Sequence, residues 1–309
     1  MLLVRCRWQA FWSSGNSHGY FDGELVRGTR NGSFTSVRPE GSLRGVIKMS
    51  KALSRGIMVP MKRKLGYGEM ETIGAMLEAS KRPSATVAIR NAFVQRGKKG
   101  APQPGTLAEM VARHDRSGLD LFLLHRLIAS APPWDAGKDA GVWARALGLA
   151  VSEDQMHAER VSRIFRRLDE EYRLVSRDSA RRGGKVTSLL EDGSGEPYMS
   201  PKTLYFRLPF SYWQQEWHRR LTMPGQAVLL IGLTQEPGFV VPQTQVKNWY
   251  GISPDTWSTG VSELMKNKVL TSVRGKKRNW MKGKAYNYDL EHTLSPPFNT
   301  RSLPGFKGP

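Results

Sequence analysis

One order of segments occurs twice along the chain, and it limits the folds that the chain can adopt more than any other feature. In each copy, several helical stretches lead into two short extended stretches that flank a basic loop. In the first copy we expect helices over 107–113, 119–128, 139–147 and 153–172, and strands over 174–176 and 186–190. In the second copy we expect a strand over 204–208, helices over 213–221, 224–233, 242–250 and 253–266, and strands over 269–273 and 285–290. Helices that end in a small hairpin, twice in series, predict a mainly helical α+β chain with two similar domains.

The last helix of the first copy carries two separate stripes of side chains. Its apolar stripe recurs at the helical period and consists of Val161, Ile164, Phe165, Leu168 and Tyr172. A second stripe of Arg160, Arg163 and Arg167 points away from that core. Because Glu159 and Glu170 lie three or four residues from these arginines, an internal ladder of ion pairs is an alternative to binding an external anion.

The corresponding helix of the second copy has clear signals at its beginning. Gly251 suits the positive φ angle that ends the preceding helix, Ser253 suits the N-cap position, and Pro254 suits the first turn. We expect Trp257, Val261 and Leu264 to face the core, together with the tryptophans on the preceding helices, Trp213, Trp217 and Trp249. The outward positions would then be Thr256, Thr259, Ser262 and Lys266, whose hydroxyl and amino groups can bind phosphates or base edges.

Both hairpins are expected to have a basic loop. The cations of the first are Arg181, Arg182 and Lys185, and those of the second are Arg274, Lys276, Lys277, Arg278, Lys282 and Lys284. Cations at this density repel one another, so a polyanionic partner such as a phosphate backbone is the natural explanation. The alternative is a hairpin tip that is surrounded by solvent alone.

The charge of the whole chain agrees with a polyanionic partner. The 309 residues include 47 lysines and arginines against 27 acidic residues, which gives a formal net charge of +20 at pH 7. DNA-binding proteins, ribosomal proteins and proteins that bind anionic membranes all have this balance. The longest apolar run, 227–231, is far too short to span a bilayer, and we expect no membrane partner.

Several classes of site are excluded by residue counts and spacing. Cys6 is the only cysteine, and none of the six histidines lies three or four residues from another. No disulfide within the chain, no zinc finger and no other metal site are therefore expected. No paired carboxylates or nucleophile with an adjacent base are visible, so we expect neither enzymatic activity nor a cofactor. The residues before Trp12 make a poor secretory signal, and the expected location is the cytoplasm, in association with the nucleoid.

The second copy carries a resemblance to known DNA-binding proteins. The segment Tyr250-Gly251-Ile252-Ser253, a capped helix ending at Leu264, the strand at Val269-Leu270 and the basic hairpin resemble bacterial winged-helix regulators. Two such units in tandem also resemble plasmid replication initiator proteins. The resemblance covers about 105–292 and implies a winged helix-turn-helix fold with duplex DNA as its partner, and it leaves a homodimer open.

The winged-helix interpretation divides the chain into four parts. These are a basic, largely disordered arm over 1–104, a first winged-helix domain over 105–196, a second over 197–292 and a disordered tail over 293–309. Within the arm, 68–80 is a candidate helix, because Met70, Ile73, Met76 and Leu77 have helical spacing. The acidic, glycine-rich stretch over 191–196 is expected to link the two domains.

The leading hypothesis is a duplex DNA-binding protein that acts in transcription regulation or in plasmid or phage replication initiation. Two alternatives stay open. An RNA-binding or ribosome-associated protein would use the basic arm as its main contact. A protein-interaction adaptor would retain the winged-helix fold without nucleic-acid binding, since fold does not fix function.

Overall fold

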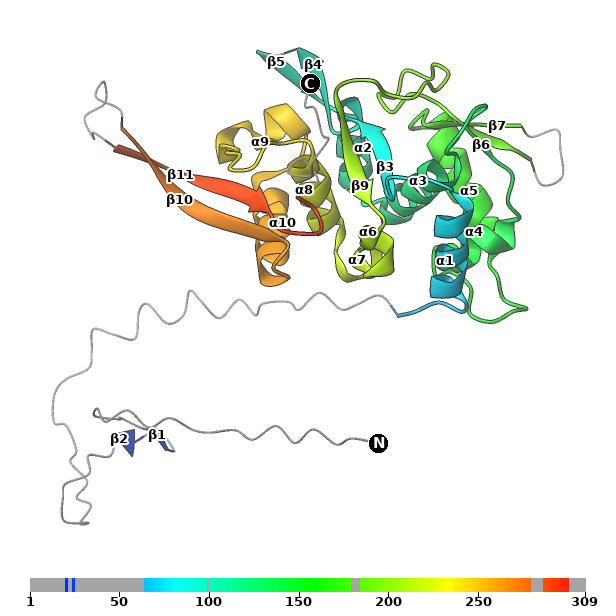
Figure 1. Cartoon of the computed structure of the whole chain (residues 1–309), viewed down its shortest axis with the longest axis horizontal. Helices are drawn as coiled ribbons and strands as arrows, with labels where there is room; N and C mark the ends of the chain where they lie inside the picture. Colours follow the sequence, from blue (N-terminus) through cyan, green and yellow to red (C-terminus); the bar gives the residue numbers. More distant parts are fainter. Residues whose placement is uncertain are drawn as a thin grey trace. The chain divides into compact units, whose positions relative to one another are not determined.

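The computed structural model describes residues 64–98, 100–178, 184–278 and 286–299, together with two short strands that pair with each other, β1 (Tyr20–Phe21) and β2 (Glu24–Leu25). Contacts divide the chain into two compact units, Met1–Met58 and Val59–Pro309, and every other described element belongs to the second. This second unit combines helices with small antiparallel sheets (Figure 1), so the predicted α+β class is confirmed.

The first of the two expected copies is present, with one additional strand. Its elements are α2 (Thr106–Ala112), α3 (Arg116–Ile128), β6 (Asp135–Ala136), α4 (Ala140–Ala146), α5 (Ala158–Glu170), β7 (Val175–Arg177) and β8 (Val186–Ser188). The three strands form one antiparallel sheet in the order β6-β8-β7. We call α3 to β8 the first repeat. Helix α5 begins at Ala158, later than the expected Glu153.

The second copy follows the same order. It consists of β9 (Tyr205–Pro209), α6 (Ser211–Gln214), α7 (Trp217–Arg220), α8 (Met223–Leu233), α9 (Gln243–Tyr250), α10 (Pro254–Lys266), β10 (Leu270–Arg278) and β11 (Tyr286–Leu294). Phe239 forms an isolated bridge with His292 of β11, as β6 pairs with β8 in the first repeat. We call α8 to β11 the second repeat. The single helix expected over 213–221 is two short helices, because Glu216 between them has a φ of 60°.

The four tryptophans on the described helices of the second copy lie where their helical spacing predicted. Trp213, Trp217 and Trp257 are buried, and Trp249 is half-buried against the same core. These side chains therefore hold the helices together and are not available as a surface on which bases could stack.

The expectation of an arm without fixed structure is wrong from residue 64 onward. This stretch contains α1 (Glu69–Ala79), as the spacing of its apolar residues predicted, and β3 (Thr86–Arg90), the 3₁₀ helix η2 (Asn91–Phe93) and the hairpin of β4 (Gln95–Lys98) and β5 (Ala101–Pro104). Ile73, Val87, Ile89 and Phe93 are fully buried, so this stretch supplies part of the core. The rest of the expected arm lies outside the described residues, apart from β1 and β2.

A two-stranded sheet joins the stretch before the first repeat to the stretch before the second. Strand β3 pairs with β9 in antiparallel register, with Val87 opposite Leu208 and Ile89 opposite Phe206. All four side chains are buried. Because each strand leads into one repeat, the pairing fixes the two repeats within one compact unit.

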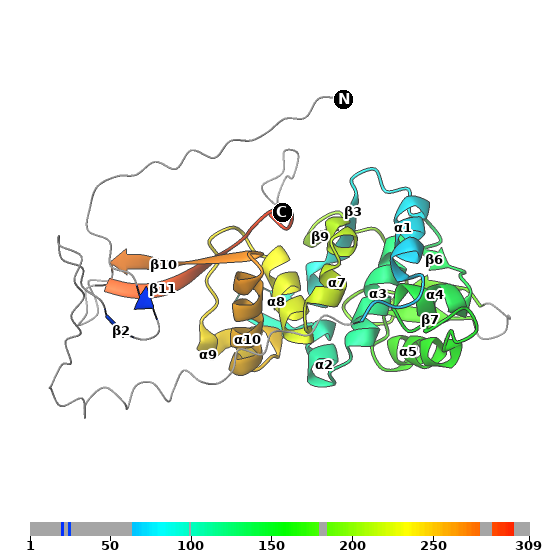
Figure 2. The ribbon, with the colours of Figure 1, turned by 90° about the horizontal axis from the view of Figure 1, so that it is seen from below.

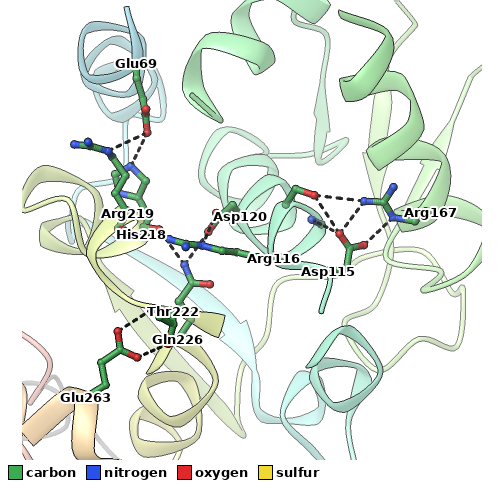
Figure 3. A network of polar contacts seen from close by, with 12 residues as sticks. Glu69, Asp115, Arg116, Asp120, Arg167, His218, Arg219, Thr222, Gln226 and Glu263 are labelled. Carbon is green, nitrogen blue, oxygen red and sulfur yellow. Dashed lines mark hydrogen bonds and ion pairs between the residues drawn. The ribbon is translucent and has the colours of Figure 1, made fainter. Parts of the chain in front are cut away.

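Polar side chains cross the same junction (Figure 3). Glu69 of α1 is fully buried, and its Oε1 lies 3.3 Å from Nε2 of His218 and 3.9 Å from Nε of Arg219, both on α7. Arg116 of α3 donates to the backbone oxygen of His218 at 2.6 Å, and Gln226 of α8 donates to Asp120 of α3 at 3.0 Å. These contacts hold α1 and α3 against α7 and α8.

The stretch expected to be a linker is anchored to the first repeat. Glu191 is fully buried, and its Oε2 accepts a hydrogen bond from Arg90 at 2.7 Å. Arg126 is also buried and stacks over the ring of Tyr198 at 3.7 Å. Two buried ions with matching partners fix the path of the backbone here, so 191–198 does not act as a free linker.

The predicted boundary of the disordered tail, at residue 293, is too early in the sequence. Strand β11 extends to Leu294, and Phe298 is 1% exposed with its ring 5.9 Å from that of Trp217. Residues 300–309 lie outside the described residues.

Candidate nucleic-acid interface

Helices α5 and α10 are equivalent elements of the two repeats. Each has 13 residues, and because they begin at Ala158 and Pro254, equivalent residues differ by 96 in number. Val161 and Trp257 are equivalent, as are Leu168 and Leu264, and all four are buried. The two helices therefore turn corresponding faces to their cores, and their outward faces can be compared position by position.

The outward face of α5 is a row of arginines that differs in one member from the expected row. Arg160, Arg163 and Arg166 are exposed, and no described residue forms an ion pair with any of them. The alternative of an ion-pair ladder with Glu159 and Glu170 has no ion pair among the described contacts. Arg166 was not predicted from the sequence as an outward, DNA-contacting residue, although its equivalent in α10, Ser262, was.

Arg167 belongs to the interior of the first repeat instead of the exposed row. Its Nε and Nη2 donate to the two carboxylate oxygens of Asp115, at 2.8 and 2.7 Å (Figure 3). Asp115 is the N-cap residue of α3 and also accepts from the backbone N–H of Gly118. Burial works to raise the pKa of Asp115, but hydrogen bonds from Arg167 and Gly118 outweigh it and hold that pKa below its usual value. Arg167 therefore fixes α5 to α3.

The second repeat has a carboxylate at the position equivalent to Arg167. Glu263 of α10 is buried and accepts from the backbone N–H of Thr222 at 2.9 Å and from the hydroxyl of Thr222. Thr222 is the N-cap residue of α8. In each repeat the third helix is thus fixed to the N-cap residue of the first helix. In the first repeat an arginine binds a capping aspartate, and in the second repeat a glutamate binds a capping threonine.

The predicted outward residues of α10 are on its surface. Thr259, Ser262 and Lys266 are exposed, and Thr256 is half-buried with its hydroxyl 2.8 Å from that of Ser253. Ser253 caps the helix as predicted, because its hydroxyl accepts from the N–H of Thr256 at 3.0 Å.

The hairpin of the second repeat is long, and its basic residues follow the alternation of a strand. Arg274, Lys276 and Arg278 occupy alternate positions of β10, opposite Leu290, Tyr288 and Tyr286 of β11. The structure describes the backbone alone at 276–278, and the expected contacts Lys282 and Lys284 lie outside the described residues.

The hairpin of the first repeat is shorter. Lys185 is exposed and lies 3.1 Å from a carboxylate oxygen of Asp135 on β6, so part of its charge is matched within the fold. Arg181 and Arg182 lie outside the described residues. The described part of this hairpin thus offers less free positive charge than the sequence predicted.

The hairpin of β4 and β5 lies beside the second repeat and was not predicted. Gln95 donates to the backbone oxygen of Trp249 on α9 at 3.3 Å, while Arg96 donates to the backbone oxygens of Pro104 and Asp192. The glycines and lysines over 97–100 signal a basic turn, but nothing local in the sequence shows that it packs on α9.

The described residues contain no group of three or more His, Cys, Asp or Glu side chains placed to hold a metal ion. Among the described helices, none combines the length and apolar composition needed to cross a bilayer. Comparisons with protein-family models, curated proteins and solved structures each found no match.

Proposed function

We propose that the two repeats are winged-helix units and that the protein binds duplex DNA through both of them. In this interpretation α5 and α10 are the recognition helices, which enter the major groove, and the β7–β8 and β10–β11 hairpins are the wings, which contact adjacent backbone. Regulation of transcription or initiation of plasmid or phage replication is the role that such binding would serve.

One observation carries the proposal: the same order of elements occurs twice, and both copies leave the outward face of the third helix free. In each repeat a helix, a strand position, two helices and a hairpin follow one another, and the strand position pairs with the last strand. In Figure 2, β10 and β11 extend from one end of the compact unit, and α5 lies toward the opposite end.

The distribution of charge supports the same interpretation. The exposed arginines of α5 have no acidic partner among the described residues, and six cations belong to the second hairpin and its loop. Each cation that replaces a counterion on a phosphate contributes to affinity and makes that affinity depend on salt.

The test is a fluorescence titration of a labelled duplex at several salt concentrations. Replacing Lys276, Lys277 and Arg278 with alanine should weaken binding to every duplex and lower the slope of log affinity against log salt by about two to three. A matched control is K64A with K81N, two exposed lysines that flank α1, where asparagine tolerates the φ of 48° at Lys81. The control should leave the slope unchanged.

An equal slope in the wing variant and the wild type would contradict the wing as a DNA contact. Tighter binding to structured RNA than to duplex DNA at the same salt would favour an RNA-binding protein. No binding to any nucleic acid at about 100 mM salt, where non-specific binding is normally measurable, would favour a protein-interaction adaptor.

A further inference from the structure

The outward faces of α5 and α10 are built at the same positions from different chemistry. Arg160, Arg163 and Arg166 are equivalent to Thr256, Thr259 and Ser262, by the offset of 96 that the buried positions establish. The internal faces are buried at three equivalent pairs of positions, Val161 and Trp257, Ile164 and Gly260, and Leu168 and Leu264. The two helices are thus held alike but present guanidinium groups in one repeat and hydroxyl groups in the other.

Helical geometry gives the three arginines different places in a groove. Successive members are three residues apart, so each is rotated by about 60° from the next and displaced by about 4.5 Å along the axis. Arg163 therefore lies at the centre of the row, with Arg160 and Arg166 on either side of it. When the centre faces the floor of the major groove, the flanking residues lean toward its walls, where the phosphates lie.

Arg163 is free to make a specific contact. It is exposed and has no ion-pair partner among the described residues, whereas Arg167, one turn later, donates from its Nε and Nη2 to both carboxylate oxygens of Asp115. Glu159, one turn before Arg163, is exposed as well, and the described contacts include no ion pair between the two. Binding through Arg163 therefore breaks no described contact.

We infer that Arg163 reads a guanine in the half of the duplex that faces α5, and that Thr259 gives the other half a different base preference. Guanine offers two acceptors, N7 and O6, at the major-groove edge, and an arginine can donate to both at once. A threonine hydroxyl makes one hydrogen bond that several bases can accept. The target would then have two unlike halves, so the protein binds it in one orientation. This inference rests on the proposed function.

The experiment begins with selection of tightly bound duplexes from a random library by the full-length chain. Each guanine of the selected site is then replaced by 7-deazaguanine, which removes the N7 acceptor and leaves base pairing intact. For the wild type we expect the affinity to fall between about five-fold and about 150-fold at one guanine under α5. For R163A we expect the unmodified site to bind more weakly and the 7-deazaguanine effect at that position to disappear, because alanine has no donor for N7, whereas lysine would keep one.

R166A is the matched control, because it makes the same substitution one position along the row. Since Arg166 is expected to contact a phosphate, R166A should keep the full effect of 7-deazaguanine and lower the salt slope by about one. The inference is overturned if R163A stays as sensitive to 7-deazaguanine as the wild type, or if selection yields no preferred guanine although duplex binding remains salt-dependent. Absence of duplex binding by the wild type would instead overturn the proposed function, so the two failures are distinguishable.

Discussion

At the scale of single residues, the surroundings of a side chain decide what it can do. Arg163 and Arg167 lie one turn apart on α5, yet the first is exposed and the second is held by both oxygens of Asp115. Arg167 also lies near Tyr172, whose hydroxyl donates to Asp115 at 3.2 Å. Burial, and then the nearby Asp115 carboxylate, raises the pKa of Tyr172 to about 12, so this hydroxyl remains a donor at neutral pH. The cluster is a structural joint between α3 and α5.

His125 is a second residue whose surroundings define its state. Its side chain is fully buried on α3, Nε2 lies 2.9 Å from the backbone oxygen of Val186, and Trp143 and Phe165 flank the ring. Burial is the main cause that lowers the pKa of His125 to about 4; the hydrogen bond to Val186 opposes it, Arg126 acts with it, and Asp135 also opposes it. The ring is therefore neutral at pH 7 and donates from Nε2.

We predict that His125 makes folding sensitive to mild acid. Its pKa is 6.5 in the unfolded chain and about 4 in the folded chain, so its contribution is complete above pH 6.5 and is lost as the pH falls toward 4. The full contribution is about 3 kcal/mol. Gln at this position retains a donor toward Val186 but cannot titrate, so H125Q should lose less stability over this range, as measured by urea unfolding at several pH values. Because the lowered pKa of His292 affects both proteins, it cancels in the difference. Parallel pH profiles would contradict the prediction.

Single residues of α5 and α10 also show which parts of the candidate site could be predicted from the sequence. Thr259, Ser262 and Lys266 were predicted correctly as exposed, because the cap at Ser253 fixes where α10 begins and therefore the rotation of its faces. Helix α5 lacks such a cap: His157 precedes it with a φ of 49° and no capping hydrogen bond. Without a fixed beginning, Arg167 and Arg166 could not be separated by spacing alone. Only Asp115, 52 residues away in the sequence, decides between them.

At the scale of elements, the turn between α9 and α10 sets the angle between two helices of the proposed DNA-binding face. Gly251 ends α9 with a φ of 66°, as its place after a helical stretch predicted. A Cβ atom there would lie 2.6 Å from Cβ of Ala108 and 2.9 Å from Cβ of Pro104. The turn therefore also packs against α2 and β5, which precede the first repeat in the chain.

We predict that G251A destabilises the protein by about 2–4 kcal/mol, since alanine adds both a positive-φ cost and a clash with atoms that cannot swing away. The control is G238A, at a glycine with a φ of 78° where an added Cβ would meet nothing within 4 Å. It should cost about 1 kcal/mol, from backbone conformation alone. Chemical denaturation of both variants measures the difference. Similar losses in the two would show that close packing at Gly251 is unimportant.

Elements with their own apolar period, and the short strands β7, β8 and β9, were predicted from the sequence, whereas β3 and β6 were not. Helices α1, α3 and α9 and the two main hairpins were expected close to where they lie. Strand β3 has five residues and gains its hydrogen bonds from β9, which lies more than 100 residues later. Strand β6 has two residues and exists through its pairing with β8. Such strands carry no local period, because distant partners stabilise them.

At the scale of the whole compact unit, the structure ties the two repeats together at several places. Strands β3 and β9 pair, Glu69 of α1 contacts His218 and Arg219 of α7, and Asp120 of α3 accepts from Gln226 of α8. These contacts come from segments before each repeat as well as from the repeats themselves. A protein that presents two helices to one duplex needs such a joint, because a flexible connection would cost entropy on binding.

The last prediction concerns this joint. Glu69 is fully buried, and its carboxylate also accepts from the backbone N–H of Gly66 at 2.9 Å. E69A removes the buried carboxylate that lies beside Arg219 and His218, so the buried guanidinium group of Arg219 loses part of its compensating charge. We therefore expect E69A to lower the free energy of unfolding by about 3 kcal/mol. The matched control is E71A, which removes an exposed carboxylate two residues along the same helix and should change stability by less than about 0.5 kcal/mol.

Local opening of the E69A variant tests whether the two repeats unfold together or separately. If the joint couples them, amide hydrogen exchange in E69A should speed up by a similar factor in α5 and in α10, because opening at the junction releases both. Glu69 lies on α1, whose described neighbours include α3 and α4 of the first repeat. Faster exchange in α5 with unchanged exchange in α10 would therefore mean that the first repeat opens alone. In that case the two helices of the proposed interface would not be held in a fixed relation by the free protein, and DNA would have to order them on binding.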